Sequence, residues 1–339
     1  MIDIPIITFG YALVVDTTPD LLTLRIVRAI AEHGTISEAA RALGYSQPAL
    51  SQHLTRAQSR IGLALIVRSG RGVRLTEAGR ALASHAVTIL NAVDAASAEL
   101  SELAGLSSGT VRIAAFPTAS STVIPRLIRQ LRQQHPNLTV NYVEAEPPQA
   151  LQLLRDGSAD VAITFSYPGD RADPHLTRDG GHTTVPLFTE PVVLVLPDSH
   201  PLASADRVSL GDLANDAWIA GCALCRGHLL ALCEVEGFAP EIGLETDNAL
   251  AVLSFVSRGL GVALLPQLAL SSLALSSLAL PEGVSIHAPQ PSSERTIQYV
   301  IQPGATRIPS VATTIATLTA LGGSAWGLHD YSASARTVR

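Results

Sequence analysis

The stretch of sequence that decides the fold is residues 34–54, which read GTISEAARALGYSQPALSQHL. Ser37 can cap a short helix over 38–43, because its side chain can accept a hydrogen bond from the first turn, and Gly44 ends that helix. Ser46 can cap a second helix that has Pro48 in its first turn, where a missing N–H costs nothing. Two short helices joined by residues 43–46 predict a helix-turn-helix.

The second of these helices has two faces. Leu50, Leu54 and Ala57 recur at i, i+4 and i+7 and point into the small domain. Short polar side chains on the opposite face can enter a major groove and meet base edges. A solvated helix face is the alternative explanation. The polar face consists of Gln47, Ser51, Gln52, Thr55 and Arg56.

The segments on either side complete a small module. Residues 21–31 have the 3.6-residue apolar period of an amphipathic helix, which Gly34 stops. Farther along, the short apolar runs 63–67 and 73–75 flank a turn of Gly and Arg and predict a β-hairpin wing. Arginines on this wing suit phosphates or an adjacent minor groove. They are Arg68, Arg71 and Arg74.

Charge separates this module from the rest of the chain. Residues 20–80 contain nine Arg and four acidic residues, a net charge of +5, whereas the whole 339-residue chain has a net charge of −6. A basic module on an acidic body is expected of a DNA reader attached to a second function. Hydrophobic residues make up 47% of the chain and charged residues 15%, which excludes a disordered chain.

A long helix is predicted from Thr76 to about residue 106. Its apolar residues recur at three- and four-residue steps, and nothing nearby in the sequence covers them. A helix of ~28 residues is ~42 Å long and usually finds a partner helix, which predicts a homodimer or homotetramer. Packing of the stripe on its own domain is the alternative. The stripe consists of Leu82, Ala86, Ile89, Leu90, Val93, Ala96, Leu100 and Leu103.

Residues 34–54, together with RGVRLTEAG at 71–79, resemble the LysR-type transcriptional regulators. Ser-Gln-Pro-Ala-Leu-Ser and Leu-Thr-Glu-Ala-Gly are hallmarks of that family, and they stand here in the family's order and separation. The resemblance continues through TVRI (110–113), IPRL (124–127), LRDGSADVAI (154–163) and GLGVALLP (259–266). It implies a winged helix-turn-helix, a linker helix and a two-lobed α/β effector domain like that of type 2 periplasmic binding proteins.

The resemblance also assigns DNA contacts. Base and backbone contacts fall on Gln47, Pro48, Ser51 and Gln52, with Ser46 at the start of the same helix, and the wing arginines contact the backbone. This chain departs from the family at Gln52, where many members have Arg or Lys, and at residues 57–58, where many have Leu-Glu. Because Gln bonds adenine but not guanine in the manner of Arg, we expect a different operator preference.

Alternating strand and helix patterns beyond residue 108 agree with the implied effector domain. The alternation predicts a mostly parallel sheet covered on both faces, and the length of this region predicts two lobes. The expected organisation is an N-terminal extension (1–19), a winged helix-turn-helix domain (20–78), a linker and dimerisation helix (79–107), the effector domain (108–322) and a mobile tail (323–339).

A binding cleft is expected where strands end and helices begin. The loop 116–121 has hydroxyls and free N–H groups that suit a carboxylate or another anion, and the family places effector contacts there. This nominates Thr118, Ser120 and Ser121, although helix capping is the alternative role. Matching loops across the cleft nominate Glu146, Thr164, Cys222 and Asn248. The carboxylate of Glu146 argues against a dianionic effector.

Three cysteines are too few for a disulfide framework, which predicts that the protein is located in a reducing cytoplasm. Some LysR-type members sense oxidants through cysteines in the region of Cys222, Cys225 and Cys233. If Cys225 and Cys233 both lie on one helix around the predicted range 228–236, the helical rise places them ~12 Å apart. That distance is beyond the reach of a disulfide unless the helix unfolds. Zinc binding lacks two further ligands at finger spacing. Packing in the second lobe, redox sensing and metal binding therefore stay open as alternatives.

Signatures of other functions are missing from the sequence. There is no Gly-x-Ser-x-Gly, no His-Glu-x-x-His and no phosphate-binding loop with Lys, so we expect no enzyme, no catalytic residue, no metal and no cofactor. The uncharged run 259–281 is interrupted by Pro and Ser, so we expect no membrane span. The predicted function is a cytoplasmic regulator that binds an inverted-repeat operator and a small effector between its lobes, with RNA polymerase as a further candidate partner. A cysteine-based oxidant sensor on the same scaffold and a solute-binding protein without DNA function are the alternatives.

Overall fold

The computed structural model describes residues 18–69, 72–103, 109–170, 173–176, 181–275 and 282–331. The chain divides into two compact units, Met1–Val93 and Asp94–Arg339, which are described in turn. In the described residues no helix is both long and apolar enough to cross a membrane.

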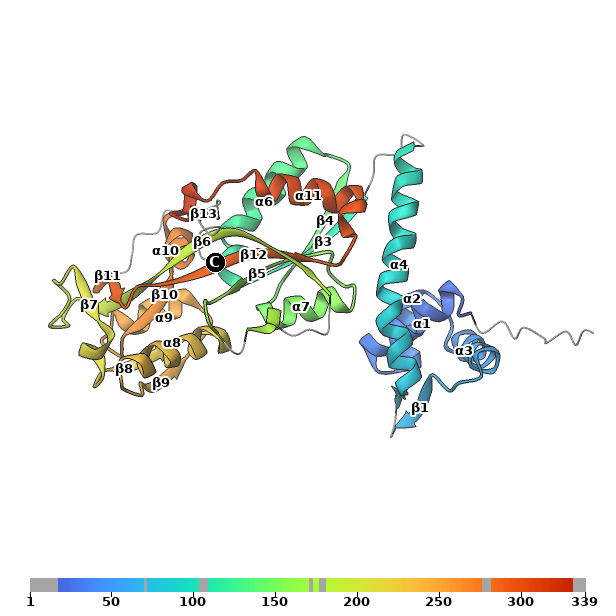
Figure 1. The fold of residues 1–339 in the computed structure, drawn as a ribbon, viewed down its shortest axis with the longest axis horizontal. Helices are drawn as coiled ribbons and strands as arrows, with labels where there is room; N and C mark the ends of the chain where they lie inside the picture. Colours follow the sequence, from blue (N-terminus) through green and yellow to red (C-terminus); the bar gives the residue numbers. More distant parts are fainter. Residues whose placement is uncertain are drawn as a thin grey trace, which may run out of the picture. The chain divides into compact units, whose positions relative to one another are not determined.

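Three helices, a hairpin and the first part of the long helix α4 (Glu77–Leu103) form the first unit (Figure 1). The helices are α1 (Leu21–His33), α2 (Ile36–Leu43) and α3 (Gln47–Ile61), and the hairpin pairs β1 (Ile66–Ser69) with β2 (Gly72–Leu75) in antiparallel register. Each helix ends at a glycine in the left-handed conformation, which satisfies the last carbonyls without a Cβ clash. The predicted helix-turn-helix is confirmed. Its core contains Leu24, Ile26, Ile30, Leu50, Leu54 and Leu65.

Two local predictions in this unit were wrong. Thr35, not Ser37, caps α2: its hydroxyl accepts from the backbone N–H of Glu38 at 3.1 Å, so the helix begins two residues earlier than expected. The wing strands are also shifted, because Leu65 is buried in the core instead of standing on a strand. The side-chain oxygen of Gln58 accepts from the N–H groups of Leu65 and Ile66 and fixes this entry into the wing.

The start of the long helix α4 (Glu77–Leu103) is locked against the segment that precedes the wing. The Thr76 hydroxyl accepts from the N–H of Gly79 at 3.0 Å and donates to the carbonyl of Ala64 at 2.6 Å. A Cβ at position 79 would lie 2.0 Å from the carbonyl oxygen of Leu65, so only glycine fits there. Thr76 and Gly79 of the Leu-Thr-Glu-Ala-Gly motif are therefore needed to fix the start of α4 against residues 64–65.

The apolar stripe of α4 does not form one seam. Ala86 and Leu90 are buried in the hydrophobic core of the first unit and Val87 is also buried, whereas Ile89 is 40% exposed and Leu100 is 67% exposed. The expectation that nothing nearby covers the stripe holds only for its exposed side, because the helix-turn-helix domain takes Ala86 and Leu90 into its own core. The exposed side remains available for a partner.

A mixed sheet organises the second unit, with strand order β4-β3-β5-β12-β6-β11-β7 and with β10 and β13 also paired to β6. The pairs β3–β4, β3–β5 and β7–β11 are parallel, but β12 runs antiparallel to both β5 and β6. The prediction of a mostly parallel sheet was therefore wrong. The strands are β3 (Gly109–Ala115), β4 (Leu138–Glu144), β5 (Val161–Ser166), β6 (Thr183–Pro197), β7 (Arg207–Ser209), β10 (Ala263–Pro266), β11 (Val284–Gln290), β12 (Ser293–Ile301) and β13 (His329–Asp330).

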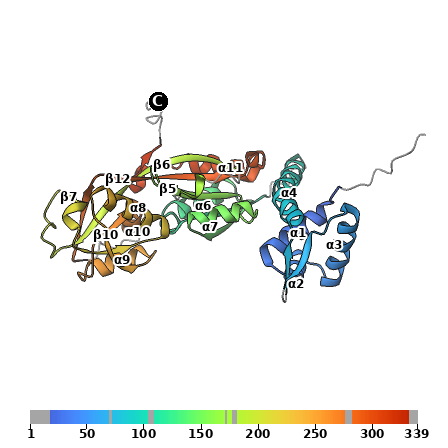
Figure 2. The same ribbon diagram turned by 60° about the horizontal axis from the view of Figure 1, so that its bottom comes forward.

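The long strand β6 connects two lobes within this unit. Its first part pairs with β12, and its last residues pair with β10 and β11. Figures 1 and 2 show the first lobe around α6, α7 and α11 and the second lobe around α8 and α9. The helices are α5 (Pro117–Ser120), α6 (Val123–Gln134), α7 (Pro147–Arg155), α8 (Ala223–Val235), α9 (Ala249–Val256), α10 (Gln267–Leu275) and α11 (Pro309–Thr319). A small parallel pair, β8 (Ala217–Ala220) and β9 (Glu241–Glu245), belongs to the second lobe.

The described residues after α11 pack on the first lobe, which corrects the expectation of a mobile tail beginning at residue 323. Strand β13 pairs with β6 opposite Thr189 and Phe188. Trp326 and Leu328 are buried in the core of the first lobe, and apolar burial is what fixes this segment. Residues 332–339, like 1–17 of the expected N-terminal extension, lie outside the described residues.

Candidate functional sites

The polar face of α3 is open to solvent. Gln47, Gln52 and Arg56 are exposed and Ser51 is half-buried, while Leu50, Leu54 and Ala57 face the core. The amide of Gln47 donates to the Ser51 hydroxyl at 2.9 Å, and the Thr55 hydroxyl donates to the Ser51 carbonyl at 2.9 Å. Ser46 caps the helix at the N–H of Ala49, and both Ser46 and Pro48 are exposed. The polar side chains predicted from the sequence thus lie on the side of α3 that faces away from the core.

A polar network that sequence reasoning missed holds α3 against α1. Asp20 accepts from Arg60 at 2.7 Å and from the N–H of Thr23 at 2.7 Å, and His53 lies 3.1 Å from the same carboxylate. Burial alone would raise the pKa of Asp20, but the hydrogen bonds from Arg60 and Thr23 hold it well below its usual range. The network joins residues up to 40 positions apart, so no local pattern signals it.

The two described wing arginines are both exposed. Arg68 lies opposite Val73 and Arg74 opposite Val67 in the β1–β2 register. Arg71 lies outside the described residues. In the described part of the wing, the positive charges therefore stand in solvent, as phosphate contacts require.

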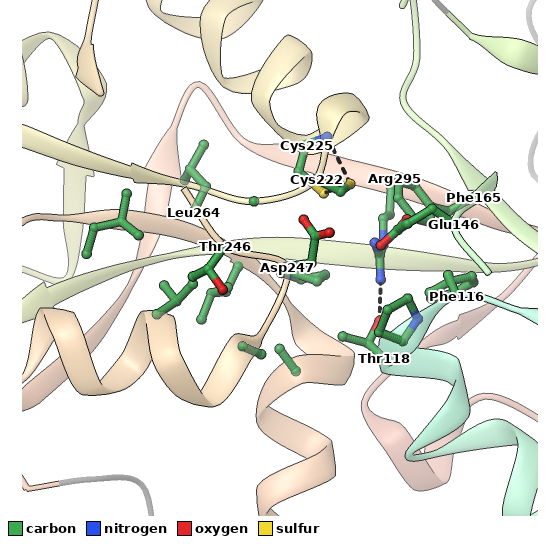
Figure 3. A pocket seen from close by; sticks show the side chains of 18 residues that line it. Phe116, Thr118, Glu146, Phe165, Cys222, Cys225, Thr246, Asp247, Leu264 and Arg295 are labelled. Atoms are coloured by element: carbon green, nitrogen blue, oxygen red, sulfur yellow. Dashed lines mark hydrogen bonds between the residues drawn. The ribbon is translucent and has the colours of Figure 1, made fainter. Parts of the chain in front are cut away.

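The second unit contains a cavity of about 50 Å³ that both lobes line (Figure 3). One water molecule needs ~10–15 Å³ of such volume, so the cavity has room for a few molecules of that size. The first lobe contributes Phe116, Thr118, Glu146 and Phe165, the second Cys222, Cys225, Thr246, Asp247 and Leu264, and Arg295 enters from β12.

A buried ion pair forms one wall of this cleft. The guanidinium of Arg295 donates to Glu190 at 2.6 Å and to the Thr118 hydroxyl at 2.9 Å. It also stacks over the rings of Phe116 and Phe165, with 4.9 Å and 4.2 Å to the ring centroids. The second oxygen of Glu190 accepts from the backbone N–H of Leu268 at the start of α10. The pair thus contacts elements of both lobes.

Two cysteines begin helix α8 at the cleft. The helix starts earlier than predicted, with Cys222 as its N-cap, so that Cys225 lies in the first turn. The two sulfur atoms are 3.0 Å apart, and the Cys225 N–H donates to the Cys222 sulfur at 3.4 Å. The hydrogen bond from the Cys222 thiol and the positive charge of Arg295 lower the pKa of the Cys225 thiol. Cys225 is thus the thiol of the pair that loses its proton more readily.

An aromatic and an imidazole ring complete the surroundings of Cys225. The Tyr167 hydroxyl donates to the Cys225 sulfur at 3.5 Å, and the Tyr167 ring stacks on His228 with 3.9 Å between centroids. Burial and the adjacent Cys225 sulfur raise the pKa of the Tyr167 phenol, which keeps it a donor. Burial lowers the pKa of His228 to about 4, so His228 is neutral at pH 7. Tyr167 follows β5 of the first lobe and Cys225 belongs to the second, so this contact crosses the cleft.

Acidic groups face the same space. Burial and the nearby Asp247 raise the pKa of Glu146 to about 6. Its Oε2 atom is buried and has no hydrogen-bond partner among the described residues. A cleft that contains Glu146 and Asp247, and whose arginine is already paired with Glu190, does not suit an anionic effector.

The predicted effector residues are not all brought together. Thr118, Glu146 and Cys222 line the cavity, but four others do not. Ser120 and Ser121 bond carbonyls of their own turn, Thr164 is buried against His175, and Asn248 caps α9 through the N–H groups of Leu250 and Ala251. Sequence reasoning missed Arg295 and Glu190, which are 105 residues apart, and placed Asn248 where its neighbours Thr246 and Asp247 line the site.

Two family models match the chain. "Bacterial regulatory helix-turn-helix protein, lysR family" matches residues 21–80, and "LysR substrate binding domain" matches residues 104–322. The DNA-binding transcriptional dual regulator OxyR of Escherichia coli K12 is 30% identical over 289 residues, 83% of this chain and 88% of that protein. A probable hydrogen peroxide-inducible genes activator of Mycobacterium avium is 33% identical over 255 residues, 74% of this chain and 78% of that protein.

Solved structures agree at the level of the fold. Full-length OxyR of Pseudomonas aeruginosa, as a cysteine-to-aspartate variant, has a TM-score of 0.68 at 21% identity and covers 89% of this chain and 95% of its own. A cysteine-to-serine mutant of Corynebacterium glutamicum OxyR with hydrogen peroxide bound has a TM-score of 0.52 at 27% identity and covers 89% of this chain and 94% of its own. With its helix-turn-helix, its two-lobed second unit and both family matches in place, the chain belongs to the LysR family of DNA-binding transcriptional regulators.

Proposed function

We propose that this regulator responds to a hydroperoxide, which meets the Cys225 sulfur in the cleft between the lobes. The observation that carries the proposal is the setting of Cys225: a cavity-lining sulfur that accepts hydrogen bonds from Cys222 and Tyr167 beside the cation of Arg295. A thiolate is the form that attacks an oxidant, and these donors and this charge stabilise it. The names of the relatives, hydrogen peroxide-inducible activators, support the same effector class.

The chemical step is a two-electron oxidation. The Cys225 thiolate attacks one peroxide oxygen, an S–O bond forms and the O–O bond breaks. Cys225 becomes a sulfenic acid, and the leaving hydroxide or alkoxide takes a proton from solvent to give water or an alcohol. The small cavity admits a peroxide more readily than a large ligand. We place the protein in the reducing cytoplasm, where the resting thiols are kept reduced.

Thiol titration tests this step directly. We expect the wild-type protein to lose titratable thiol when equimolar hydrogen peroxide is added, and Cys225→Ser to retain its thiols over the same period. Cys233→Ser is the matched control and should react like wild type at Cys225, because Cys233 is fully buried away from the cleft. If Cys225→Ser loses its remaining thiols as fast as wild type loses its own, Cys225 is not the sensor.

We further propose how the first unit reads its operator. The exposed face of α3 enters the major groove, where Gln47, Ser51 and Gln52 meet base edges, while Arg56, Arg68, Arg71 and Arg74 contact phosphates. A dimer through α4 requires an inverted repeat with half-sites one or more helical turns apart. The family resemblance also nominates RNA polymerase as a partner of the DNA-bound protein.

Two variants separate base reading from phosphate binding. Gln52→Ala should reduce the preference for operator over random DNA by about 1–3 kcal/mol. Arg74→Ala should weaken binding to all sequences. It should also reduce the slope of log affinity against log salt concentration by about 1. Ser59→Ala, an exposed position on the same helix, is the control. Equal loss of specific and random binding in Gln52→Ala would remove the base-contact assignment.

A further inference from the structure

The three cysteines differ in their distance from one another. Cys222 and Cys225 occupy the N-cap and first turn of α8, and their sulfur atoms are 3.0 Å apart. A disulfide bond is about 2.05 Å long, so the two atoms need to approach by about 1 Å. Both residues line the cleft, where an oxidant arrives.

Cys233 lies near the other end of the same helix. It lies eight positions after Cys225, and at 1.5 Å per residue that is a rise of ~12 Å. Its side chain is fully buried in the core of the second lobe with Trp218 and Leu229. Burial and Glu236 raise the pKa of Cys233 to about 11, which keeps it a thiol. A bond between Cys225 and Cys233 would require α8 to unwind and this core to open.

The hydrogen bonds between the two cysteines also determine which of them is the donor thiol. The Cys222 thiol donates to the Cys225 sulfur, and the Cys222 sulfur accepts from the Cys225 N–H. The hydrogen bond and burial raise the pKa of Cys222. Cys222 is therefore protonated while Cys225 reacts, and it is already placed beside the sulfur that becomes oxidised.

Resting on the proposed peroxide response, we propose that Cys222 resolves the oxidised Cys225, so that the sensor state is a Cys222–Cys225 disulfide within the first turn of α8. The Cys222 sulfur attacks the sulfur of the Cys225 sulfenic acid. An S–S bond forms, the S–O bond breaks, and the leaving hydroxide takes the proton that Cys222 loses. Two thiols and one hydrogen peroxide thus give one disulfide and two molecules of water.

This disulfide changes a contact between the lobes. The Cys225 sulfur is the acceptor of the Tyr167 hydroxyl, and as a thiolate it also faces the positive charge of Arg295. In the disulfide, both sulfur atoms are neutral, and a neutral sulfur atom is only a weak hydrogen-bond acceptor. Tyr167, from the first lobe, then has only this weak acceptor on the second lobe. Oxidation therefore weakens a link across the cleft without unfolding α8, and a changed lobe arrangement is the signal that follows.

Tryptic peptides distinguish the two possible disulfides, because the chain contains no Lys and trypsin therefore cuts only after Arg. Cleavage after Arg207, Arg226 and Arg258 places Cys222 and Cys225 together on 208–226 and leaves Cys233 alone on 227–258. The full-length protein is treated with equimolar hydrogen peroxide, quenched in acid, alkylated, digested and weighed. We expect peptide 208–226 to be unalkylated and lighter by two hydrogen atoms, with 227–258 alkylated once.

Each other outcome has one meaning. A disulfide-linked pair of 208–226 and 227–258, or a lasting sulfenic or sulfinic acid on Cys225 in wild type, overturns Cys222 as the resolving residue but leaves the peroxide response standing. Unchanged, doubly alkylated 208–226 overturns the peroxide response as well.

A substitution gives an independent readout. In Cys222→Ser we expect Cys225 to accumulate as sulfenic and then sulfinic acid, since a serine hydroxyl still caps α8 but cannot form a disulfide. Cys233→Ser should form the 208–226 disulfide at the wild-type rate. Thermal unfolding of both variants in the reduced state confirms that the fold is retained. A Cys222→Ser protein that still stops at a disulfide, through Cys233, contradicts the proposal.

Discussion

Arg295 and Glu190 stand directly opposite each other on the paired strands β12 and β6, with 2.6 Å between guanidinium Nε and carboxylate, and neither side chain is more than 2% exposed. β6 is the strand that passes from one lobe to the other. Through Thr118 and the N–H of Leu268, the pair also holds α5 of the first lobe and α10 of the second. It is therefore both a structural anchor of the cleft and the source of positive charge near Cys225.

Removing one member of this pair should be costly. Arg295→Met leaves the Glu190 carboxylate buried without its charge partner, which typically costs about 3–5 kcal/mol. The double variant Arg295→Met, Glu190→Leu should recover most of that loss. Urea unfolding of each variant measures it. The control is Arg226→Ala, which removes the exposed ion pair with Glu245. Such a pair contributes about 1 kcal/mol or less to the free energy of unfolding. If Arg295→Met costs no more than Arg226→Ala, the pair does not stabilise the cleft.

The contrast between these residues and the helix-turn-helix shows what a sequence can predict. Gly34, Gly44 and Gly62 end helices through local backbone conformation, and Ser46 caps α3 within three residues, so the pattern along the chain carries the information. Arg295 depends on a partner 105 residues away and on an antiparallel strand pair that joins the lobes. Local patterns do not encode such pairings, and for the same reason they could not show which of the polar loop residues face the cleft.

Gly79 offers a test of how α4 is locked to the rest of the first unit. In Gly79→Ala, the new methyl group would lie 2.0 Å from the Leu65 carbonyl, and the required shift should cost about 1–3 kcal/mol. Gly227→Ala in α8 meets no atom within 4 Å and should stabilise the protein by up to about 1 kcal/mol. Circular dichroism during thermal unfolding compares the two. Equal effects would show that the close approach at Gly79 is easily relieved.

The two sides of α4 should respond differently to charge. Ile89→Glu places a carboxylate on the exposed side and should dissociate a dimer while the fold is kept. Leu90→Glu buries a carboxylate in the helix-turn-helix core and should unfold the first unit, at a cost of several kcal/mol. Sedimentation and circular dichroism separate these outcomes. Wild type that sediments as a monomer at micromolar concentration would show that the exposed side does not bind a second copy.

Glu146 should make stability depend on pH. Because its pKa rises from 4.5 to about 6 on folding, the protonated form is favoured in the native state. The resulting stabilisation is full below about pH 4.5 and is lost as the pH rises through about 6. Glu146→Gln should therefore be more stable than wild type at pH 8, by about 1 kcal/mol after solvent screening, and similar at pH 4.5. Denaturant midpoints at both pH values measure this, with the exposed Glu294→Gln as control. A difference that does not change with pH would mean that Glu146 titrates normally.

The most direct test of the central claim is a DNase I footprint on the DNA upstream of the protein's own gene, with reduced and with peroxide-treated protein. The account predicts that peroxide shifts the protected boundaries of wild type and of Cys233→Ser, that a thiol reductant restores them, and that Cys225→Ser gives the reduced footprint under both conditions. A Cys225→Ser footprint that still shifts with peroxide, or a wild-type footprint that does not shift although Cys225 is oxidised, would contradict it.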